Sequence, residues 1–395
     1  MKRKIGLIVG YNGEGFLGLQ YNKDLNTIEK AIVEVLLSSK CITEINSLDP
    51  KKIALKSSSR TDKGVHASFN CVIVKIIREP TPELYEELRK PLLSKGIHLY
   101  KIVKLTKRFV GHKMARSRVY KYIVPTFFFK NDSFEDDYKK LESKRSTMES
   151  ELQDDGDKIS NDKEDSCSNL NEEKRESFRK KIFRAYPDSL IYSLKGYRSD
   201  RIQCFNDILQ HYVGTKNFHN FTPKSCPGDS TRIIKSITVS EAFVDNDIEF
   251  IEVTLHGQSF LLHQIRKMIS FAVLNCKYLQ NGNSTFKNSH KEPNESELDN
   301  RNCENASIEQ NFSLAFSSAE VKVPKAPSQY LFLNHIFFDD YNLKAEEKIE
   351  VLSEEKAKFE KETIYPAVLK NENILEWFKF FDSVYFHHED FDYLK

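Results

Sequence analysis

The sequence predicts an α+β fold made of two ferredoxin-like units, with helices appended at the C-terminus. Two observations support this prediction. Segments of alternating apolar residues and segments of helical periodicity follow one another through both halves of the chain, in an order typical of that unit. The chain also has 395 residues, of which 39% are hydrophobic and 12% aromatic. That is enough for two or three domains with apolar cores.

The N-terminal half supplies the strand–helix–strand–strand–helix–strand order of a ferredoxin-like unit. Strands are expected at residues 4–12, 52–56, 67–77, 97–105 and 118–126, and helices at residues 26–39 and 81–96. RNA-recognition domains share this architecture, so the order is also typical of RNA-binding proteins.

The C-terminal half resembles a second unit of the same kind. Helices are expected at residues 205–218 and 261–279, strands at residues 231–244 and 249–260, and appended helices at residues 344–362 and 374–386. The order of these elements suggests that the two units have a similar core.

These elements predict four parts of the chain. They are an N-terminal α+β domain at residues 1–125, an acidic disordered insertion at 131–180, a C-terminal α+β domain at 181–342 with a second disordered insertion at 280–313, and a helical extension at 343–395. Both insertions lack apolar periodicity. They carry net charges of −6 and −3 within a total of +2, so the rest of the chain carries +11. This basic remainder favours an anionic partner such as nucleic acid.

Several classes of protein are disfavoured by what the sequence lacks. No apolar run reaches the length of a membrane-spanning helix, and the first residues do not resemble a secretory signal. The seven cysteines are scattered with no CxxC pair. This argues against a disulfide framework and a zinc module, and it suits a reducing compartment. We therefore expect no metal and no membrane association.

The segment "GEGFLG" at residues 13–18 fits the dinucleotide-binding pattern GxGxxG. That pattern works because its last glycine opens a helix whose N-terminus holds the pyrophosphate. Here the helix is expected to begin only near Asn26 or Thr27. A nicotinamide-dependent oxidoreductase is therefore a disfavoured alternative.

The segment "SSSRTDKGVHAS" at residues 57–68 places a carboxylate between two expected strands. Asp62 lies in a loop that either forms a solvated turn or presents its carboxylate to a ligand from a rigid support. Arg60 lies two residues away, on the same side if the backbone is extended. Its guanidinium would then favour the ionised carboxylate, or it contacts a phosphate.

Two later segments add candidate residues. Tyr120 and Tyr122 share one face of the strand expected at residues 118–126, where either could be an ordinary core aromatic residue. His263 and Arg266 are three residues apart on the helix expected at residues 261–279, so they share a face. We interpret His263 as a structural residue.

Six segments together resemble the TruA family of tRNA pseudouridine synthases, most closely its eukaryotic branch. In chain order they are "GYNGEGFLGLQYN", "SRTDKGVHA", "MARSRVYKYIVPTFFF", "GTKNFHNFT", "GQSFLLHQIRKMI" and "APSQYLFLNHIFFDDYN". The resemblance covers about residues 4–130 and 185–342. Two departures are Ser59, where bacterial members usually have glycine, and the residues 117–119 ahead of Tyr120. Neither departure removes a functional group.

The resemblance implies an isomerase that converts uridine to pseudouridine in tRNA without a cofactor. It assigns the catalytic nucleophile to Asp62, with Arg60 beside it, and stacking on the target uracil to Tyr120. It places Arg266 at the cleft as a candidate partner of Asp62. The expected fold is therefore two units similar to RNA-recognition domains, whose antiparallel sheets meet at this basic cleft. Attack on the sugar, attack on the uracil ring and stabilisation of a separated glycal all remain open for Asp62.

The expected partner is tRNA, with other structured RNA as a further candidate. A non-catalytic RNA-binding protein on the same scaffold is the alternative from another class, and the presence of Asp62, Arg60 and Tyr120 argues against it. The expected state is a monomer, with a dimer as the alternative. The resemblance implies a nuclear protein, with the mitochondrion and the cytoplasm as alternatives.

Overall fold

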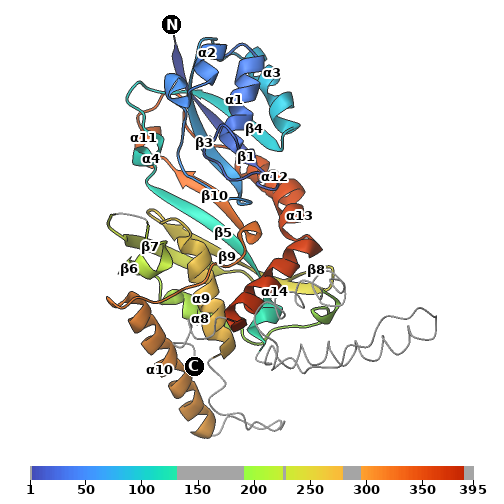
Figure 1. Ribbon diagram of the computed structural model, residues 1–395, viewed down its shortest axis with the longest axis vertical. Helices are drawn as coiled ribbons and strands as arrows, with labels where there is room; N and C mark the ends of the chain where they lie inside the picture. Colours follow the sequence, from blue (N-terminus) through green and yellow to red (C-terminus); the bar gives the residue numbers. More distant parts are fainter. Residues whose placement is uncertain (1, 131–190, 226–227, 279–294, 387–395) are drawn as a thin grey trace, which may run out of the picture.

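One large sheet runs through both halves of the chain. The computed structural model describes residues 2–130, 191–225, 228–278 and 295–386; the insertion expected at residues 131–180 lies outside them. Within the described residues, the strands follow the order β4–β1–β3–β10–β5–β9–β7–β6, with β2 paired to β3 and β8 paired to β9 (Figure 1). The pairs are antiparallel except for β10 with β3, which is parallel. The α+β class and the mostly antiparallel sheet are therefore confirmed.

The strands have the following bounds: β1 (Arg3–Tyr11), β2 (Lys56–Ser57), β3 (His66–Ile76), β4 (Ile97–Lys104), β5 (Ser117–Pro125), β6 (Gly214–Asn217), β7 (Thr231–Val239), β8 (Phe243–Asp245), β9 (Ile248–Gly257) and β10 (Leu331–Phe337). The helices are α1 (Ile28–Ser38), α2 (Glu44–Ser47), α3 (Pro82–Leu93), α4 (Gly111–Met114), α8 (Ile202–Gln210), α9 (Gln264–Tyr278), α10 (Glu295–Phe316), α11 (Asp339–Asn342), α12 (Ser353–Phe359), α13 (Tyr365–Val368) and α14 (Asn371–Phe386). Short 3-10 turns lie at Pro50–Ile53, Thr126–Phe129, His219–Phe221 and Ser328–Tyr330, and a π-helical turn lies at Glu360–Ile364. None of the described helices is long and apolar enough to cross a membrane.

Strand β10 joins the two halves into a single sheet. It pairs with β3 of the N-terminal half on one side and with β5 on the other (Figure 1). Two separate sheets that meet at a cleft were expected, so the structure differs in this respect. The sequence did not predict β10 because the polar residues Asn334 and His335 interrupt its short apolar run, which leaves neither a continuous apolar segment nor a regular alternation.

The expected helices of the N-terminal half form because each has a capped start and an apolar stripe. In α1 the Thr27 hydroxyl accepts a hydrogen bond from the backbone N–H of Lys30 at 3.3 Å. Ile28, Ile32 and Leu36, four residues apart, are buried along one side of this helix. Burial of this stripe positions α1 against the core beside the glycine-rich segment that precedes it.

Two expected elements have other forms. Residues 52–56, expected as a strand, begin in the 3-10 turn Pro50–Ile53, which Asp49 caps through the N–H of Lys51 at 2.9 Å. Only Lys56 and Ser57 pair with β3. The helix expected at residues 205–218 stops at Gln210 because Gly214 takes a positive φ of 102° and begins β6.

The expectation of a disordered insertion at residues 280–313 is wrong for its second part. Helix α10 occupies Glu295–Phe316, and residues 280–294 lie outside the described part. The helix is anchored near its end, where Ile308 and Phe312 are buried. The ring of Phe312 lies 5.1 Å from that of Phe271 in α9, centroid to centroid. Burial of these side chains offsets the low helical propensity of the polar part.

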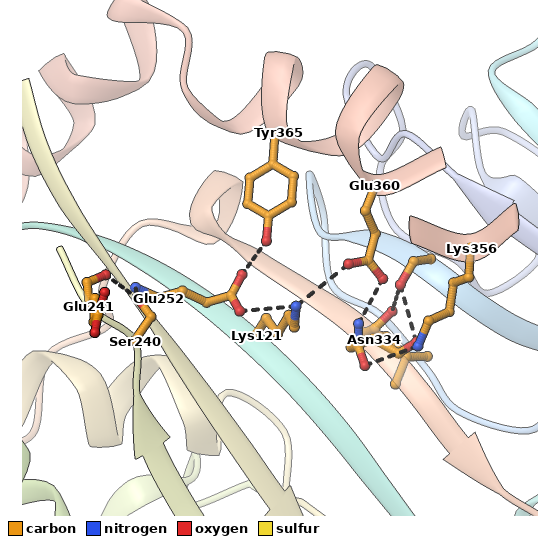
Figure 2. A network of polar contacts seen from close by, with 10 residues as sticks. Lys121, Ser240, Glu241, Glu252, Asn334, Lys356, Glu360 and Tyr365 are labelled. Carbon is orange, nitrogen blue, oxygen red and sulfur yellow. Dashed lines mark hydrogen bonds and ion pairs between the residues drawn. The ribbon is translucent and has the colours of Figure 1, made fainter. Parts of the chain in front are cut away.

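Helices α12 and α13 and the π-helical turn between them cover the face of the sheet opposite to that of Tyr120, whereas α14 packs on the same face as Tyr120, with the rings of Trp377 and Tyr122 6.3 Å apart. Neighbouring residues of a strand point to opposite faces, and Lys121 of β5 reaches towards the C-terminal helices (Figure 2). Its ammonium lies 2.9 Å from a carboxylate oxygen of Glu252 in β9 and 3.5 Å from one of Glu360 in the π-helical turn. One cation thus links two strands of the sheet to the C-terminal extension.

The same network continues to β10 and α12. Asn334 of β10 donates to Glu360 at 2.7 Å and accepts from Lys356 of α12 at 3.3 Å (Figure 2). Burial lowers the pKa of Lys356, against the effect of the nearby Glu360 carboxylate. The Tyr365 hydroxyl donates to Glu252. Since two carboxylates meet two ammonium groups here, the network carries no excess charge, which makes its burial tolerable.

Candidate active site

A cavity of about 720 Å³ lies where the Asp62 loop, β5 and the N-terminal end of α9 meet. All four residues singled out in the sequence line it: Arg60, Asp62, Tyr120 and Arg266. They come from three segments that are up to 206 residues apart, counted from Arg60 to Arg266. The structure therefore brings the four residues together at one site.

Hydrogen bonds from the glycine-rich segment and its flanking residues support the Asp62 loop. The backbone N–H of Leu19 donates to the carbonyl of Thr61 at 3.1 Å, and the Thr61 hydroxyl lies 2.8 Å from the Tyr11 hydroxyl. The N–H of Val65 donates to the Asp62 carbonyl at 3.1 Å and closes the loop. These bonds give Asp62 the rigid support that a catalytic loop requires.

Close approach between the two loops explains two of the three glycines of "GEGFLG". A Cβ atom on Gly13 would lie 2.3 Å from the Val65 carbonyl oxygen, and one on Gly18 would lie 3.2 Å from that of Thr61. Helix α1 begins at Ile28, ten residues beyond Gly18. The segment is therefore a packing support for the Asp62 loop, and its glycines do not open a helix as a dinucleotide site requires.

His263 is the direct partner of the Asp62 carboxylate. Its Nδ1 lies 2.8 Å from Oδ2 of Asp62. His263 immediately precedes α9 and has a left-handed φ of 62°. The sequence indicates only a structural role for this histidine, so the expected role is incomplete and the contact with Asp62 is not predicted from it. Only its position three residues before Arg266 in the matched segment could have drawn attention to it.

Arg266 lies at the cavity but bonds elsewhere. Its Nε donates to the carbonyl of Ala326 at 2.6 Å. Burial lowers the pKa of its guanidinium, and the nearby Tyr122 and Asp62 oppose that shift. Among the ion pairs of the described residues, within 4.0 Å, Asp62 pairs with His263 and not with Arg266. Arg266 therefore acts on Asp62 at longer range.

Tyr120 lines the cavity with its hydroxyl engaged in a hydrogen bond. It is 7% exposed, and its hydroxyl lies 2.9 Å from that of Ser59. Its ring meets Phe260 edge to face, with centroids 5.2 Å apart. Burial raises the pKa of the phenol and the Asp62 charge adds to this, while the Ser59 hydrogen bond and Arg118 oppose it. Tyr120 therefore stays a neutral aromatic surface beside Asp62.

The cavity mouth is positively charged. Lys56, Arg60 and His112 line it together with the buried Arg118. Burial lowers the pKa of His112, and the positive charges of Lys56, Lys113, Arg118 and Arg60 add to this. A concentration of positive charge at the mouth favours an anionic ligand such as a nucleic-acid backbone.

Arg118 ties the walls of the cavity together. Its guanidinium donates to the carbonyls of Gln258 at 2.9 Å, His112 at 3.2 Å and Ser58 at 3.4 Å. It therefore connects the Asp62 loop to the end of β9. All of these bonds are to backbone oxygens, so Arg118 organises the site rather than contacting a ligand through these donors.

Glu29 is the second carboxylate of the cavity, and it is bound from within the protein. It accepts from the Ser57 hydroxyl at 2.7 Å and from the backbone N–H of Tyr21 at 2.8 Å. Burial raises its pKa, while these hydrogen bonds and Arg60 oppose the shift.

Among the described residues, no three His, Cys, Asp or Glu side chains group as metal ligands.

Comparison with known proteins gives consistent matches. Residues 208–339 match a family model described as tRNA pseudouridine synthase. A Kluyveromyces lactis protein named tRNA pseudouridine synthase 1 is 31% identical over 375 residues, covering 88% of this chain and 62% of that protein. The Saccharomyces cerevisiae protein of the same name is 30% identical, covering 88% of this chain and 63% of that protein. This chain thus spans less than two thirds of the length of both relatives.

A third relative is covered over most of its length. The Saccharomyces cerevisiae protein named tRNA pseudouridine(27/28) synthase is 31% identical over 362 residues, covering 86% of this chain and 85% of that protein. The regions matched include both the Asp62 half and the α9 half of the cavity, because they extend over nearly all of the chain.

Proposed function

Because this chain belongs to the family of tRNA pseudouridine synthases, we propose that it isomerises uridine to pseudouridine in tRNA. The reaction breaks the bond between the uracil nitrogen and the sugar, turns the base and rejoins it to the sugar through carbon. A carboxylate and a place for the turned base are what the protein must supply. The observation that carries the proposal is the shared cavity of Asp62, Arg60, Tyr120 and Arg266.

Asp62 is the nucleophile or the charge-stabilising carboxylate of this reaction. Carboxylates serve as covalent nucleophiles at sugar carbons in other enzymes. The loop of Asp62 is held by hydrogen bonds of Thr61 with Leu19 and Tyr11, so the backbone that carries the carboxylate keeps its place while the base turns. Arg60, exposed beside it, favours the ionised carboxylate or fills the space that the flipped base leaves in the helix.

Tyr120 is the surface on which the target uracil stacks. A uridine inside a helix must be flipped out before a carboxylate in a cavity can reach it. Tyr120 lies one hydrogen bond from the Asp62 loop, through Ser59, so ring and carboxylate are held together. Arg266 contributes its positive charge near Asp62. The cations at the mouth bind the tRNA backbone mainly through shape and phosphates.

The proposal also includes the two units of the fold, the substrate, the oligomeric state and the location of the protein. We propose that each half of the sheet, with its two helices, corresponds to a ferredoxin-like unit, with β10 as the added strand that joins them. The substrate is tRNA, with other structured RNA as a second candidate. The protein acts as a monomer in the nucleus.

The direct test is to incubate the purified protein with uridine-labelled tRNA and no added cofactor, and to digest the RNA and separate its nucleosides. Pseudouridine should accumulate with time and in proportion to enzyme. A protein that binds tRNA but forms no pseudouridine would support the non-catalytic RNA-binding alternative. Reaction that appears only with an added nicotinamide cofactor would contradict the proposal as well.

A further inference from the structure

The backbone at His263 is strained at the point where it meets Asp62. Its φ of 62° is left-handed, a conformation that costs a non-glycine residue free energy. Such a conformation persists only where the surrounding structure determines it, and it is concentrated at functional sites. The strained residue here is also the one that bonds the carboxylate proposed to act on the substrate.

The turn around His263 is fixed on both sides. The Leu262 carbonyl accepts from the Thr222 hydroxyl at 3.1 Å, and the Leu261 N–H donates to the Gln264 side chain at 2.8 Å. The His263 carbonyl accepts from the Lys267 N–H at 3.0 Å, which begins the hydrogen bonding of α9. The backbone held in this way places the imidazole within hydrogen-bond distance of Oδ2 of Asp62.

This contact defines how the Asp62 carboxylate is turned. The terminal torsion of an aspartate is soft, so without a partner the two oxygens exchange places easily. A donor at 2.8 Å on Oδ2 leaves Oδ1 as the free oxygen. Both the neutral ring with its proton on Nδ1 and the imidazolium donate from Nδ1. The bond therefore does not depend on which of the two forms is present.

We propose that His263 is a positioning residue for the reaction, which holds the carboxylate of Asp62 so that Oδ1 faces the substrate. The inference rests on the proposed function. Arg266 does not take this role because, among the described residues, the ion pair of Asp62 within 4.0 Å is with His263 and not with Arg266. The left-handed backbone at His263 is needed to bring the imidazole to Asp62. A substitution that relieves this strain and removes the imidazole should therefore stabilise the protein and slow the reaction.

Two substitutions separate the role of the side chain from that of the backbone. His263→Gly accepts the left-handed conformation without strain and removes the donor. His263→Asn also tolerates this conformation, and its Nδ2 atom lies near the place of Nδ1, so it restores a donor. Lys40→Gly is the matched control, since Lys40 is exposed, has φ of 54° and lies outside the cavity.

The measurements are the rate constant of a single turnover with enzyme in excess, the dissociation constant for tRNA, and the midpoint of thermal unfolding. For His263→Gly we expect a rate about 10- to 100-fold lower, as for a misplaced catalytic group, with tRNA affinity unchanged and an unfolding midpoint at or above that of wild type. His263→Asn should recover most of the rate. Lys40→Gly should raise the midpoint without changing the rate.

The results distinguish a failure of the proposed function from a failure of the positioning role of His263. A wild-type protein that forms no pseudouridine would contradict the proposed function and this inference with it. An active wild type with His263→Gly equally fast, or with His263→Asn as slow as His263→Gly, would overturn the positioning role alone. A His263→Gly variant with a clearly lowered unfolding midpoint would also overturn it, since the histidine would then be structural.

Discussion

Acid should destabilise this protein through His66, a histidine buried in its neutral form. His66 is 2% exposed in β3, and its Nδ1 accepts from the Gly13 N–H at 3.1 Å while Nε2 donates to the Gln329 carbonyl across 3.2 Å. Because Nδ1 must keep its lone pair for Gly13, protonation would break this bond. Burial lowers the pKa of His66 from 6.5 to about 4. The His66 ring thus connects the glycine-rich segment, which supports the Asp62 loop, to the 3-10 turn that precedes β10.

The size of the effect follows from the two pKa values. Between pH 6.5 and pH 4 the unfolded chain binds a proton at His66 that the folded protein does not bind. The free energy of unfolding therefore falls as the pH falls. For a folded pKa of about 4, the free energy of unfolding should drop by about 2 kcal/mol from pH 7 to pH 5 through this residue alone. Below the folded pKa the loss from this group is complete.

Urea unfolding at pH 7 and pH 5 measures the drop, and His66→Gln isolates it. Glutamine does not titrate in this range and keeps a donor and an acceptor. The variant should be less stable at pH 7 because it packs less well, yet its own drop between the two pH values should be about 2 kcal/mol smaller than that of wild type. Equal drops in the two proteins would refute the assignment to His66.

Three further substitutions test the site and the scaffold. Tyr120→Ala should weaken capture of the flipped base by about 1–3 kcal/mol, whereas Tyr120→Phe should keep most of it; equal kinetics of the Ala variant and wild type on a stem uridine would reject the stacking surface. Phe312→Ala should cost about 3–5 kcal/mol of unfolding free energy, against almost none for Leu314→Ala on the exposed side of the same helix; a small loss at Phe312 would mean that α10 contributes little to the fold. Lys121→Met leaves two carboxylates without their shared cation and should cost about 3–5 kcal/mol, measured by urea unfolding; wild-type stability would show that the network in Figure 2 does not hold the C-terminal extension.

Much of the sheet could be predicted from the sequence because local signals agreed with the final structure. β1, β3, β4, β5 and β9 alternate or run apolar between clear turn residues, and α1 has both a cap and an apolar stripe. β10 could not be predicted in this way, since Asn334 and His335 interrupt its short apolar run. The joining of two expected sheets into one depends on that strand, so it was missed as well.

The residues of the candidate site could be predicted from the sequence, but the contacts between them could not. Asp62, Arg60, Tyr120 and Arg266 stood out through motifs, and all four line the cavity. The partner of Asp62 was not predictable, because helical spacing counts His263 as part of α9, whereas its left-handed φ places it in the turn before the helix. A single backbone torsion, which no residue pattern for histidine indicates, decides which side chain reaches the carboxylate.

The most direct test of the whole account is the Asp62→Asn variant under single-turnover conditions, with tRNA binding measured on the same preparation. Asparagine keeps the shape and can still accept the hydrogen bond from His263, but it lacks the negative charge that the reaction requires. The account predicts no detectable pseudouridine, with tRNA affinity within a few-fold of wild type and an unchanged unfolding midpoint. Substantial pseudouridine formation by this variant would contradict it, because Glu29, the other carboxylate lining the described cavity, is already bound by Ser57 and Tyr21.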